Sequence, residues 1–362
     1  MQYGLTDFYT AMMSVNSCSM LILMYIVGKS NTLNRERKIL FSLIFATVFI
    51  AGACEWLGVM LDGCGGYLKY MHIFVKFVES SIAPAIPILF CWVINKKWVK
   101  LCVGFLSFHA VMQFVSMKYG FISYIDSQNI YHHGSQHWIY VLVCTLACAF
   151  GLIFLFSNTK KYQYNRISQY IMIAAMLALD AGIQLVTFDI RIIYIGVGMC
   201  ASILYITVME MIQQTDGLTE LLNRISFEND IVSHRKNKKR SMILFFDVDS
   251  FKYVNDHFGH EYGDVVLKNI GNAVRETYSS YGKCYRYGGD EFCVILTKSM
   301  DRVDALNETF AAKIREIHEK DDRMPCVSVG YAVFHPGTET MKDAVANADQ
   351  VMYEIKRKRK SG

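Results

Sequence analysis

Arg286-Tyr287-Gly288-Gly289-Asp290-Glu291-Phe292 is the stretch of this sequence that decides the fold of its C-terminal part. The two glycines permit a tight backbone turn because they lack a β-carbon, and two carboxylates follow them at once. Hydrophobic residues flank the unit on both sides. The pattern predicts a β-hairpin with acids at its tip, where a metal ion and a phosphorylated ligand can reach them.

A second group of acids follows a predicted strand further upstream. Ser241–Phe246 is an unbroken apolar run that ends in Asp247-Val248-Asp249. A strand that ends in acids places carboxylates at the edge of a sheet, the usual position for ligands in open α/β folds. Ser250, Phe251 and Lys252 then form a turn whose free backbone amides and lysine suit a phosphate group.

The neighbouring segments are predicted to be helical. Asp216–Arg224 is typical of a turn that opens a helix reaching Phe227. Another helix is expected after Lys252, ahead of the apolar run Val265–Leu267. The polar and glycine residues that this helix carries are Asn255, Asp256, Gly259, His260, Gly263 and Asp264.

Taken together, these segments resemble the GGDEF diguanylate cyclases over residues 215–360. The resemblance rests on ordered motifs with matching spacing: Asp216-x-Leu218-Thr219-x-Leu221-x-Asn223-Arg224, Asp247-x-Asp249-x-Phe251-Lys252-x-x-Asn255-Asp256, Gly259-His260-x-x-Gly263-Asp264, Gly288-Gly289-Asp290-Glu291-Phe292, Ser328-Val329-Gly330 and Ala348-Asp349-x-x-Met352-Tyr353-x-x-Lys356. It implies an α/β domain of the ferredoxin- or palm-like nucleotidyl cyclase type over residues 213–362.

The resemblance also implies a reaction, the condensation of two GTP into cyclic di-GMP with release of pyrophosphate. Two such domains, each with one GTP, must face each other, so a homodimer is expected. Mg²⁺ or Mn²⁺ would be held by Asp247, the carbonyl group of Val248, Asp290 and Glu291. Asp290 occupies the position of the general base, either acid can share the metal, and Lys252 would stabilise charge in the transition state.

The remaining substrate contacts are carried over from the same family. Asn255 and Asp264 match the positions that bind the base. A carboxylate at 264 accepts from the N1–H and the exocyclic amine of guanine, which favours GTP over ATP. Lys356 would bind the terminal phosphates, and Lys360 stands where many relatives have arginine. The full expected set is Ser250, Phe251, Asn255, His260, Asp264, Gly288, Gly289, Lys356 and Lys360.

One window departs from the family pattern. Many relatives carry an Arg-x-x-Asp product-inhibition site before the glycines, and this chain has Ser279-Ser280-Tyr281-Gly282 there. Weak product inhibition is therefore expected.

The N-terminal part is far more apolar than a soluble domain. Hydrophobic residues make up 53% of the 362-residue chain and charged residues 19%, and the apolar stretches precede a boundary near Met211. Seven of them approach the roughly 20 residues that a helix needs to cross a bilayer. They are Tyr9–Val27, Ile39–Leu61, Met71–Ile94, Leu101–Met117, Trp138–Phe156, Gln169–Phe188 and Ile192–Ile212. The fourth is the shortest and the last two share a tight turn, so six spans is the competing count.

Loop charges predict the orientation of these spans. One set of alternate loops carries Lys29, Arg35, Arg37, Lys38, Lys96, Lys97, Lys100, Lys160, Lys161 and Arg166, and the other set carries Lys69, Lys118 and Arg191. The positive-inside rule places the first set in the cytoplasm. The N-terminus is then outside, and residues 213–362 are cytoplasmic, below a seven-helix domain over residues 1–212 in the inner (plasma) membrane.

Ionisable residues within the spans are candidates for a sensor site, because a charge in hydrocarbon costs several kcal/mol unless it is paired. Lys76 and Glu79 are three residues apart and can meet on one helical face. With Glu55 they form either a structural ion pair or a ligand or proton site near the outer side. Asp180, expected near mid-membrane, is the sharper candidate, and the alternative is a structural hydrogen bond to a neighbouring Ser or Tyr. Pro84 and Pro87 predict a kink in the third helix.

The layout of seven apolar spans before an output domain resembles the seven-helix N-terminal region of some bacterial histidine kinases and cyclases. The expected fold class is therefore a multi-pass α-helical membrane bundle followed by an α/β domain, and the expected partners are the lipid bilayer, GTP and an unidentified sensed ligand. The formal net charge of +5 mostly reflects topology, and no aromatic-basic platform for nucleic acid accompanies it. No Cys/His spacing indicates zinc.

The leading function is a signal-regulated diguanylate cyclase of the membrane. The main alternative is a non-enzymatic membrane receptor that binds GTP or cyclic di-GMP. A transport protein with a regulatory nucleotide domain is a third class, although no inverted repeat supports it.

Overall fold

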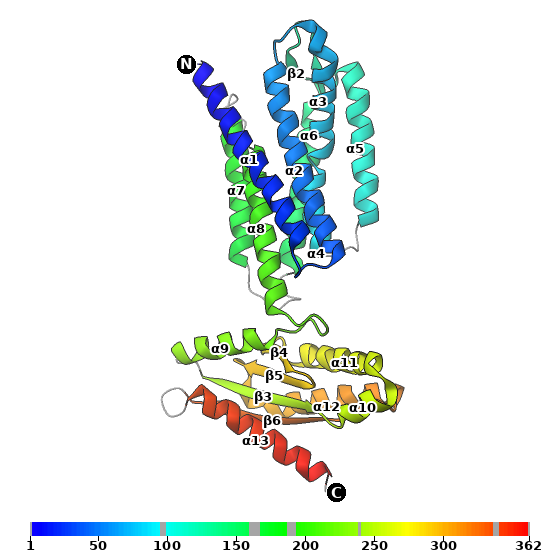
Figure 1. Cartoon of the computed structure of the whole chain (residues 1–362), viewed down its shortest axis with the longest axis vertical. Coiled ribbons are helices and arrows are strands. Elements are labelled where there is room, and N and C mark those ends of the chain that lie inside the picture. Colours follow the sequence, from blue (N-terminus) through cyan, green and yellow to red (C-terminus); the bar gives the residue numbers. More distant parts are fainter. Residues whose placement is uncertain are drawn as a thin grey trace. The chain divides into compact units, whose positions relative to one another are not determined.

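The computed structural model describes residues 2–94, 99–158, 167–186, 193–237, 240–335 and 340–360. These residues fall into two compact units, one ending at Met209 and the other beginning at Glu210. The boundary lies within one continuous helix, α8 (Ile193–Gln214), so the chain passes from the first unit to the second without a loop (Figure 1).

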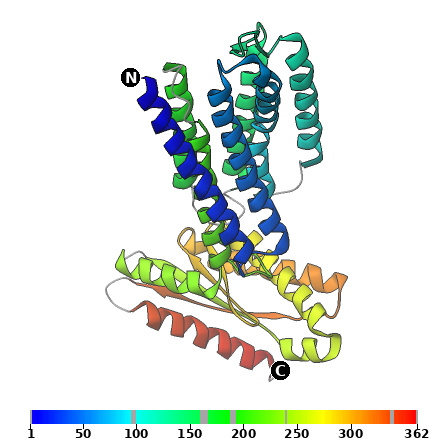
Figure 2. The same cartoon turned by 45° about the horizontal axis from the view of Figure 1, so that its top comes forward.

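The first unit is built from helices. In chain order they are α1 (Gln2–Lys29), α2 (Arg35–Leu61), the 3₁₀ turn η1 (Gly66–Leu68), α3 (Lys69–Ile82), α4 (Ala85–Ile94), α5 (Val99–Tyr119), α6 (His137–Asn158), α7 (Ile167–Val186) and α8. A short hairpin, β1 (Ser123–Ile125) and β2 (Tyr131–His133), joins α5 to α6. Helices α1 and α2 pack against each other, as Figure 2 shows.

Apolar helices cover the described parts of the predicted spans, and residues 187, 188 and 192 lie outside the described residues. Not all of these helices reach membrane-spanning length and composition. Among the described residues four do so: Thr6–Lys29, Arg35–Leu61, Gly66–Val93 and Ile193–Gln214. Shorter apolar helices cover His137–Gly151 and Ser168–Asp180. The first unit is therefore apolar and helical, as expected for a membrane protein, and the count of seven stays a prediction. Several orientation residues lie outside the described residues: Lys96, Lys97, Lys160, Lys161, Arg166 and Arg191.

The predicted kink in the third span is a break between α3 and α4. The α-helix ends at Ile82, and Ala83 N–H still donates to Glu79 O at 3.1 Å. Pro84 follows, and it has no N–H with which to continue the ladder. Pro87 lies in the first turn of α4, where a missing N–H is tolerated.

The second unit is an α/β domain with a four-stranded antiparallel sheet. Its elements are α9 (Arg224–Lys236), β3 (Ser241–Val248), α10 (Phe251–Phe258), α11 (His260–Tyr278), β4 (Gly282–Gly288), β5 (Glu291–Leu296), η2 (Met300–Arg302), α12 (Val303–Lys320), β6 (Val327–Phe334) and α13 (Met341–Lys360). The strand order is β4-β5-β3-β6, and each neighbouring pair is antiparallel.

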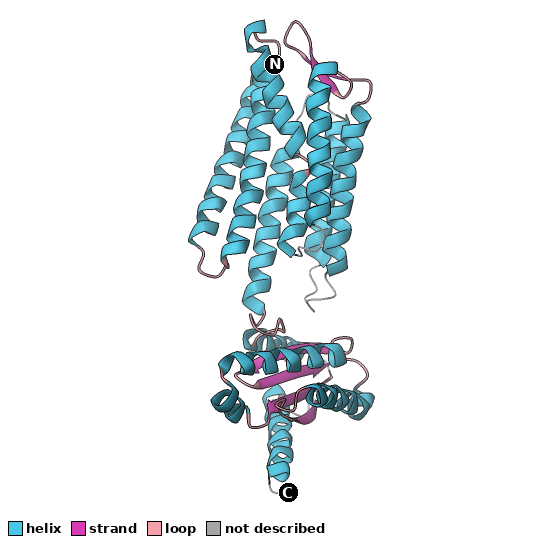
Figure 3. Cartoon of the chain, turned by 90° about the vertical axis from the view of Figure 1, so that its right-hand side faces the viewer, coloured by secondary structure: helices cyan, strands magenta, loops and turns pink. Residues whose placement is uncertain are grey.

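Helices cover both faces of this sheet, as Figure 3 shows. One hydrophobic core joins the sheet to α10, α11 and α12 through residues such as Val266 and Phe310. The other joins it to α9 and α13 through residues such as Phe227 and Ala348. Strand β3 lies between β5 and β6 and is apolar on both sides, which explains its unbroken apolar sequence.

Two predicted helices have different limits. Residues 216–223 form the expected turn, and α9 begins at Arg224 but continues past Phe227 to Lys236. The helix expected after Lys252 is divided into α10 and α11 at Gly259, which has a φ of 83°. A positive φ at glycine ends a helix at little steric cost, so Asn255 and Asp264 stand on different helices.

Candidate active site

The predicted hairpin is formed by β4 and β5, with its acids at the tip. The Cα partner of Gly288 is Glu291, and the register shifts between Arg286 and Gly288. Gly289 has a φ of 41°, a left-handed conformation that favours glycine. A β-carbon at Gly288 would meet no atom within 4 Å. The turn therefore favours glycine at 289, whereas no contact with the described residues requires glycine at 288.

The register of the sheet brings the acids of two motifs together. Asp247 at the end of β3 pairs with Glu291 at the start of β5. Val248 N–H donates to the carbonyl oxygen of Asp290 at 3.3 Å. Burial raises the pKa of Asp290 and of Glu291, and the nearby charge of Asp247 raises both further. These three carboxylates therefore repel one another where two strands meet.

A lysine from the C-terminal helix reaches this group. Lys356 Nζ on α13 forms an ion pair with Asp247 Oδ1, and both side chains are mostly buried. The ammonium group also lowers the pKa of Asp290, against the larger effect of burial. Lys360 ends α13, and its side chain lies outside the described residues.

The oxygen donors here suit a hard divalent cation. Carboxylates and a backbone carbonyl are the ligands that Mg²⁺ takes in proteins. After the larger effect of burial, the charge of Asp247 also raises the pKa of Asp290 and Glu291, and a cation would offset that repulsion. Within the described part of the chain, no three His, Cys, Asp or Glu side chains already converge as a metal site. Asp247, Asp290 and Glu291 fit the ion chemically, and the side chain of Asp247 is bound by Lys356.

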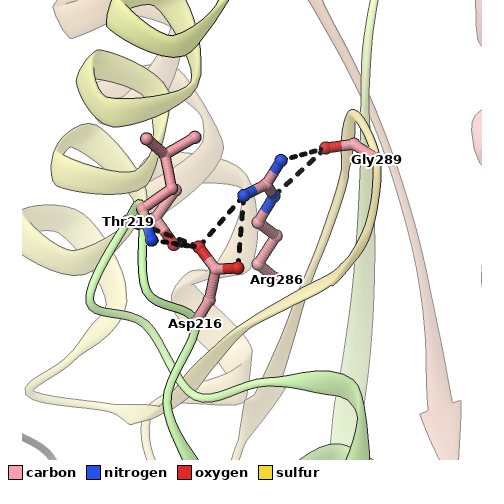
Figure 4. A network of polar contacts seen from close by, with 5 residues as sticks. Asp216, Thr219, Arg286 and Gly289 are labelled. Atoms are coloured by element: carbon pink, nitrogen blue, oxygen red, sulfur yellow. Dashed lines mark hydrogen bonds and ion pairs between the residues drawn. The ribbon is translucent and has the colours of Figure 1, made fainter. Parts of the chain in front are cut away.

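Arg286 holds the hairpin to the start of the domain, and the sequence patterns assigned it no role. Its Nη1 lies 3.1 and 3.2 Å from the two carboxylate oxygens of Asp216. Its Nε and Nη2 donate to the carbonyl oxygen of Gly289 at 3.1 and 2.8 Å (Figure 4). One guanidinium thus fixes the backbone of the glycine turn. The sequence feature that could have suggested this contact is the arginine at 286, two residues before the first glycine, together with the aspartate at 216 near the start of the domain.

Asp216 is itself held by several donors. Thr219 donates to it through its N–H and its hydroxyl, both at 2.8 Å. Burial works against ionisation, but the hydrogen bonds of Thr219 and Arg286 outweigh it and lower the pKa of Asp216. The carboxylate is therefore ionised at neutral pH and available as a partner for Arg286.

The predicted base-binding residues lie close together across the break between α10 and α11. A β-carbon at Gly263 would lie 2.0 Å from Asn255 Oδ1, so the amide of Asn255 packs directly on this glycine. Asp264 is the next residue and is exposed. Phe251 is half-buried against the core. The amide of Asn255 thus packs beside Gly263, and the exposed carboxylate of Asp264 belongs to the next residue of α11.

The other predicted ligands lie near the helix N-termini. Ser250 has a φ of 55° and precedes α10. Lys252, in the first turn of α10, and His260, the first residue of α11, are exposed. None of these three side chains is drawn into the core, so all remain accessible to a ligand.

Comparison with known proteins agrees with this geometry. Residues 213–362 match the family model described as "Diguanylate cyclase, GGDEF domain". The C-terminal unit is a GGDEF domain.

Curated relatives match over the same part. The diguanylate cyclase DgcN of Escherichia coli K12 is 35% identical over 155 residues, which is 40% of this chain and 37% of DgcN. The diguanylate cyclase DosC of the same organism is 34% identical over 159 residues, 40% of this chain and 33% of DosC. This chain thus spans about a third of the length of these relatives.

A solved structure also matches. It is the coiled coil and GGDEF domain of DgcB from Caulobacter crescentus in complex with c-di-GMP. The match has 24% sequence identity, covers 42% of this chain and 85% of that chain, and has a TM-score of 0.38.

The window that departs from the family pattern lines a pocket of the GGDEF domain. Ser279–Tyr281 form the turn between α11 and β4, and Gly282 begins β4. All four residues line a pocket of about 360 Å³, together with α9 and the end of β5. Lys283 Nζ lies 2.7 and 2.9 Å from the two carboxylate oxygens of Asp230. Lys283, one of the two lysines that line the pocket, is therefore already paired with Asp230.

The four sensor candidates of the helical unit are buried or nearly so, and two of them, Lys76 and Glu79, contact each other. Glu55 is 3% exposed and accepts from the hydroxyl of Tyr9 at 3.2 Å. Lys76 Nζ lies 2.8 Å from Glu79 Oε2, as the spacing predicted. Asp180 is 8% exposed on α7.

Proposed function

We propose that this chain is a membrane-bound diguanylate cyclase that condenses two GTP into cyclic di-GMP and pyrophosphate. The observation that carries the proposal is the pairing of Asp247 with Glu291 beneath the Gly-Gly turn of a GGDEF domain. The relatives named as diguanylate cyclases support it. No acid or glycine of the motif is lost, as it would be in a degenerate domain.

Asp290 is proposed to take the proton from the 3′-hydroxyl of GTP. Burial and the charge of Asp247 raise its pKa, which strengthens a carboxylate as a base. Asp290 is at the hairpin tip, where a substrate hydroxyl can approach. Arg286 holds the turn through the Gly289 carbonyl and so positions the acid without touching the substrate.

A divalent metal, Mg²⁺ or Mn²⁺, would supply charge neutralisation for the triphosphate when bound. Asp247, the Val248 carbonyl, Asp290 and Glu291 would hold it. Lys356, paired with Asp247 in this structure, is then free to bind the terminal phosphates, a role that Lys360 shares. Lys252 is proposed to stabilise charge on the reacting phosphate.

Asn255 and Asp264 are proposed to bind the guanine base. The amide is held in place by packing on Gly263, so its two polar atoms are oriented before the ligand arrives. Asp264 accepts from the two donors that distinguish guanine from adenine. Ser250, Phe251, His260, Gly288 and Gly289 complete the proposed substrate site.

The proposed topology has seven membrane helices over residues 1–212 and a cytoplasmic cyclase over 213–362, with the N-terminus outside the bacterial plasma membrane. Each active site uses one GTP, so the reaction requires two domains face to face in a homodimer. The helical unit is proposed to control when they meet, with Glu55, Lys76, Glu79 and Asp180 as candidate sensor residues.

Turnover of GTP by the full-length chain in detergent or proteoliposomes tests the proposal. Cyclic di-GMP and pyrophosphate are expected with Mg²⁺ present, and Asp290→Ala should lose the product. Asp301→Asn, an exposed carboxylate in η2, is the matched control and should keep wild-type activity. GTP binding without any cyclic product from the wild type would instead favour a non-enzymatic receptor.

A further inference from the structure

Asp180 is a buried acid of the helical unit, and one of its carboxyl oxygens has no hydrogen-bond partner among the described residues. The side chain is 8% exposed, and among the described residues its Oδ2 makes no hydrogen bond. Glu79 of the same unit has Lys76 at 2.8 Å, and Glu55 has the hydroxyl of Tyr9. The unpartnered carboxyl oxygen of Asp180 therefore needs another explanation.

The carboxyl group lies in a notch of α8, the helix that leads to the cyclase. A β-carbon at Gly196 would lie 1.4 Å from Asp180 Oδ2 and 2.4 Å from its Cγ. The acid therefore occupies the space that any other residue at 196 would fill.

A second notch on the same helix holds a neutral side chain. Asn16 of α1 packs on Gly198, where a β-carbon would lie 2.2 Å from its Oδ1. Its Nδ2 donates to Tyr194 O at 3.1 Å. Polar groups from two helices thus meet the backbone of α8, and the ionisable one is Asp180.

The chemistry of the notch favours a proton over a metal ion. A metal ion needs several oxygen ligands, and the described residues contain no group of three metal-ligating side chains. A proton needs only one oxygen. The titratable group close enough to interact with the charge of Asp180 is the thiol of Cys200 on α8, and Cys148 of α6 lies near that thiol. Among the described residues, no basic side chain lies close enough to Asp180 to stabilise its charge.

We propose that Asp180 is a proton-binding site whose ionisation shifts α8 and so sets the output of the cyclase. An ionised carboxylate without a partner is strongly disfavoured in an apolar interior, so loss of the proton drives the side chain out of the notch. The end of α8 is tied to the GGDEF domain, because Gln214 O accepts from Asn223 N–H at 2.9 Å and from the Ser226 hydroxyl at 2.8 Å. This inference rests on the proposed cyclase function.

Infrared difference spectroscopy on the full-length chain in proteoliposomes tests proton binding without any use of cyclase activity. A carboxylic C=O stretching band that titrates with pH is expected, and it should be absent in Asp180→Asn. An identical band in both proteins, or none in the wild type, would overturn the inference.

Activity then tests the coupling. The rate of cyclic di-GMP synthesis is measured against pH for wild type and Asp180→Asn, and the ratio of the two rates is taken, since both share the same catalytic residues. The ratio is expected to change about fivefold or more between acid and alkaline pH. At low pH the two should agree, because the amide resembles the protonated acid. A flat ratio would overturn the coupling, as would a dependence on Na⁺ at fixed pH.

A second substitution guards against loss of folding in Asp180→Asn. Gly196→Ala puts a methyl group where the carboxyl lies, so it should also flatten the pH response. Gly104→Ala on α5, where a β-carbon meets nothing within 4 Å, is the matched control and should leave the response unchanged. Absence of product from every variant at every pH would instead reject the cyclase function, and the infrared band would still decide the proton site.

Discussion

The acids of the GGDEF domain and those of the helical unit are held in different ways. In the domain, Asp247 and Glu291 come from strands that hydrogen bonds keep in register, so residues far apart in sequence meet at one point. In the helical unit, Glu55 and Asp180 stand on separate helices, each with its own neighbours. Strand pairing fixes which side chains converge, whereas helix packing depends on the shapes of side chains, which a motif does not record.

The largest expected effect is on catalysis at Asp290, and it should come without a loss of stability. Asp290→Asn should lower cyclic di-GMP synthesis about 100-fold or more, because it removes the base. The midpoint of thermal unfolding should not fall, since burial and the charge of Asp247 raise the pKa of Asp290 and make its ionised form unfavourable in the fold. Any gain in stability of Asp290→Asn over wild type should vanish as the pH falls below about 4, where the carboxyl group is protonated in both the folded and the unfolded wild type. A large loss of stability at pH 7 would mean that Asp290 is structural.

Arg286 provides the next test, since it links the hairpin to Asp216. Arg286→Met should lower the free energy of unfolding by about 1.5–3 kcal/mol, the range for hydrogen bonds to charged groups. It should also lower the rate about tenfold because the turn loses its anchor. Lys283→Met is the matched control on the same strand. Its ion pair with Asp230 is more exposed, so about 0–1 kcal/mol is expected. Equal losses in the two variants would show that Arg286 has no special role.

The same ion pair predicts a pH dependence. The pKa of Asp216 is lowered in the folded protein, so its contribution to stability is present above the unfolded pKa of about 4 and is lost as the pH falls through the folded value. Asp216→Asn should therefore be less stable than wild type at neutral pH, and the difference should shrink in strong acid. Chemical denaturation at several pH values measures it, and a difference that grows toward acid would reverse the sign.

Sequence and structure agree best where a motif also sets strand register. The apolar run before Asp247 and the glycine turn predict β3 and the hairpin, because their periodicity and turn chemistry are local. The division of the next helix at Gly259 could not be read with the same certainty, since glycine is also tolerated within helices. The contacts of Arg286 with Gly289 and of Asp180 with Gly196 depend on three-dimensional packing, so no spacing rule predicts them.

Gly288 gives a smaller effect that tests whether the site binds a ligand at all. A β-carbon there meets nothing within 4 Å, and the residue does not have a left-handed φ. Gly288→Ala should therefore fold as well as wild type. If the triphosphate approaches this backbone, the rate of cyclic di-GMP synthesis should fall about fivefold, which corresponds to a loss of about 1 kcal/mol of transition-state stabilisation. The KM for GTP should account for most of the change. Unchanged kinetics would remove Gly288 from the proposed site.

The smallest expected effect concerns the window at Ser279–Gly282. Unlike the hairpin, this window contains no charged residue. Its side chains offer no guanidinium fork for a phosphate or a guanine, and Lys283 in the adjoining pocket is already paired with Asp230. Added cyclic di-GMP at low-micromolar concentration should therefore lower the rate less than about twofold, which corresponds to a weak affinity. Initial rates measured with added product decide this. Strong inhibition that persists in Lys283→Met and is relieved by a higher GTP concentration would mean that product competes at the active site. Strong inhibition lost in Lys283→Met would make the pocket a regulatory site despite its missing arginine.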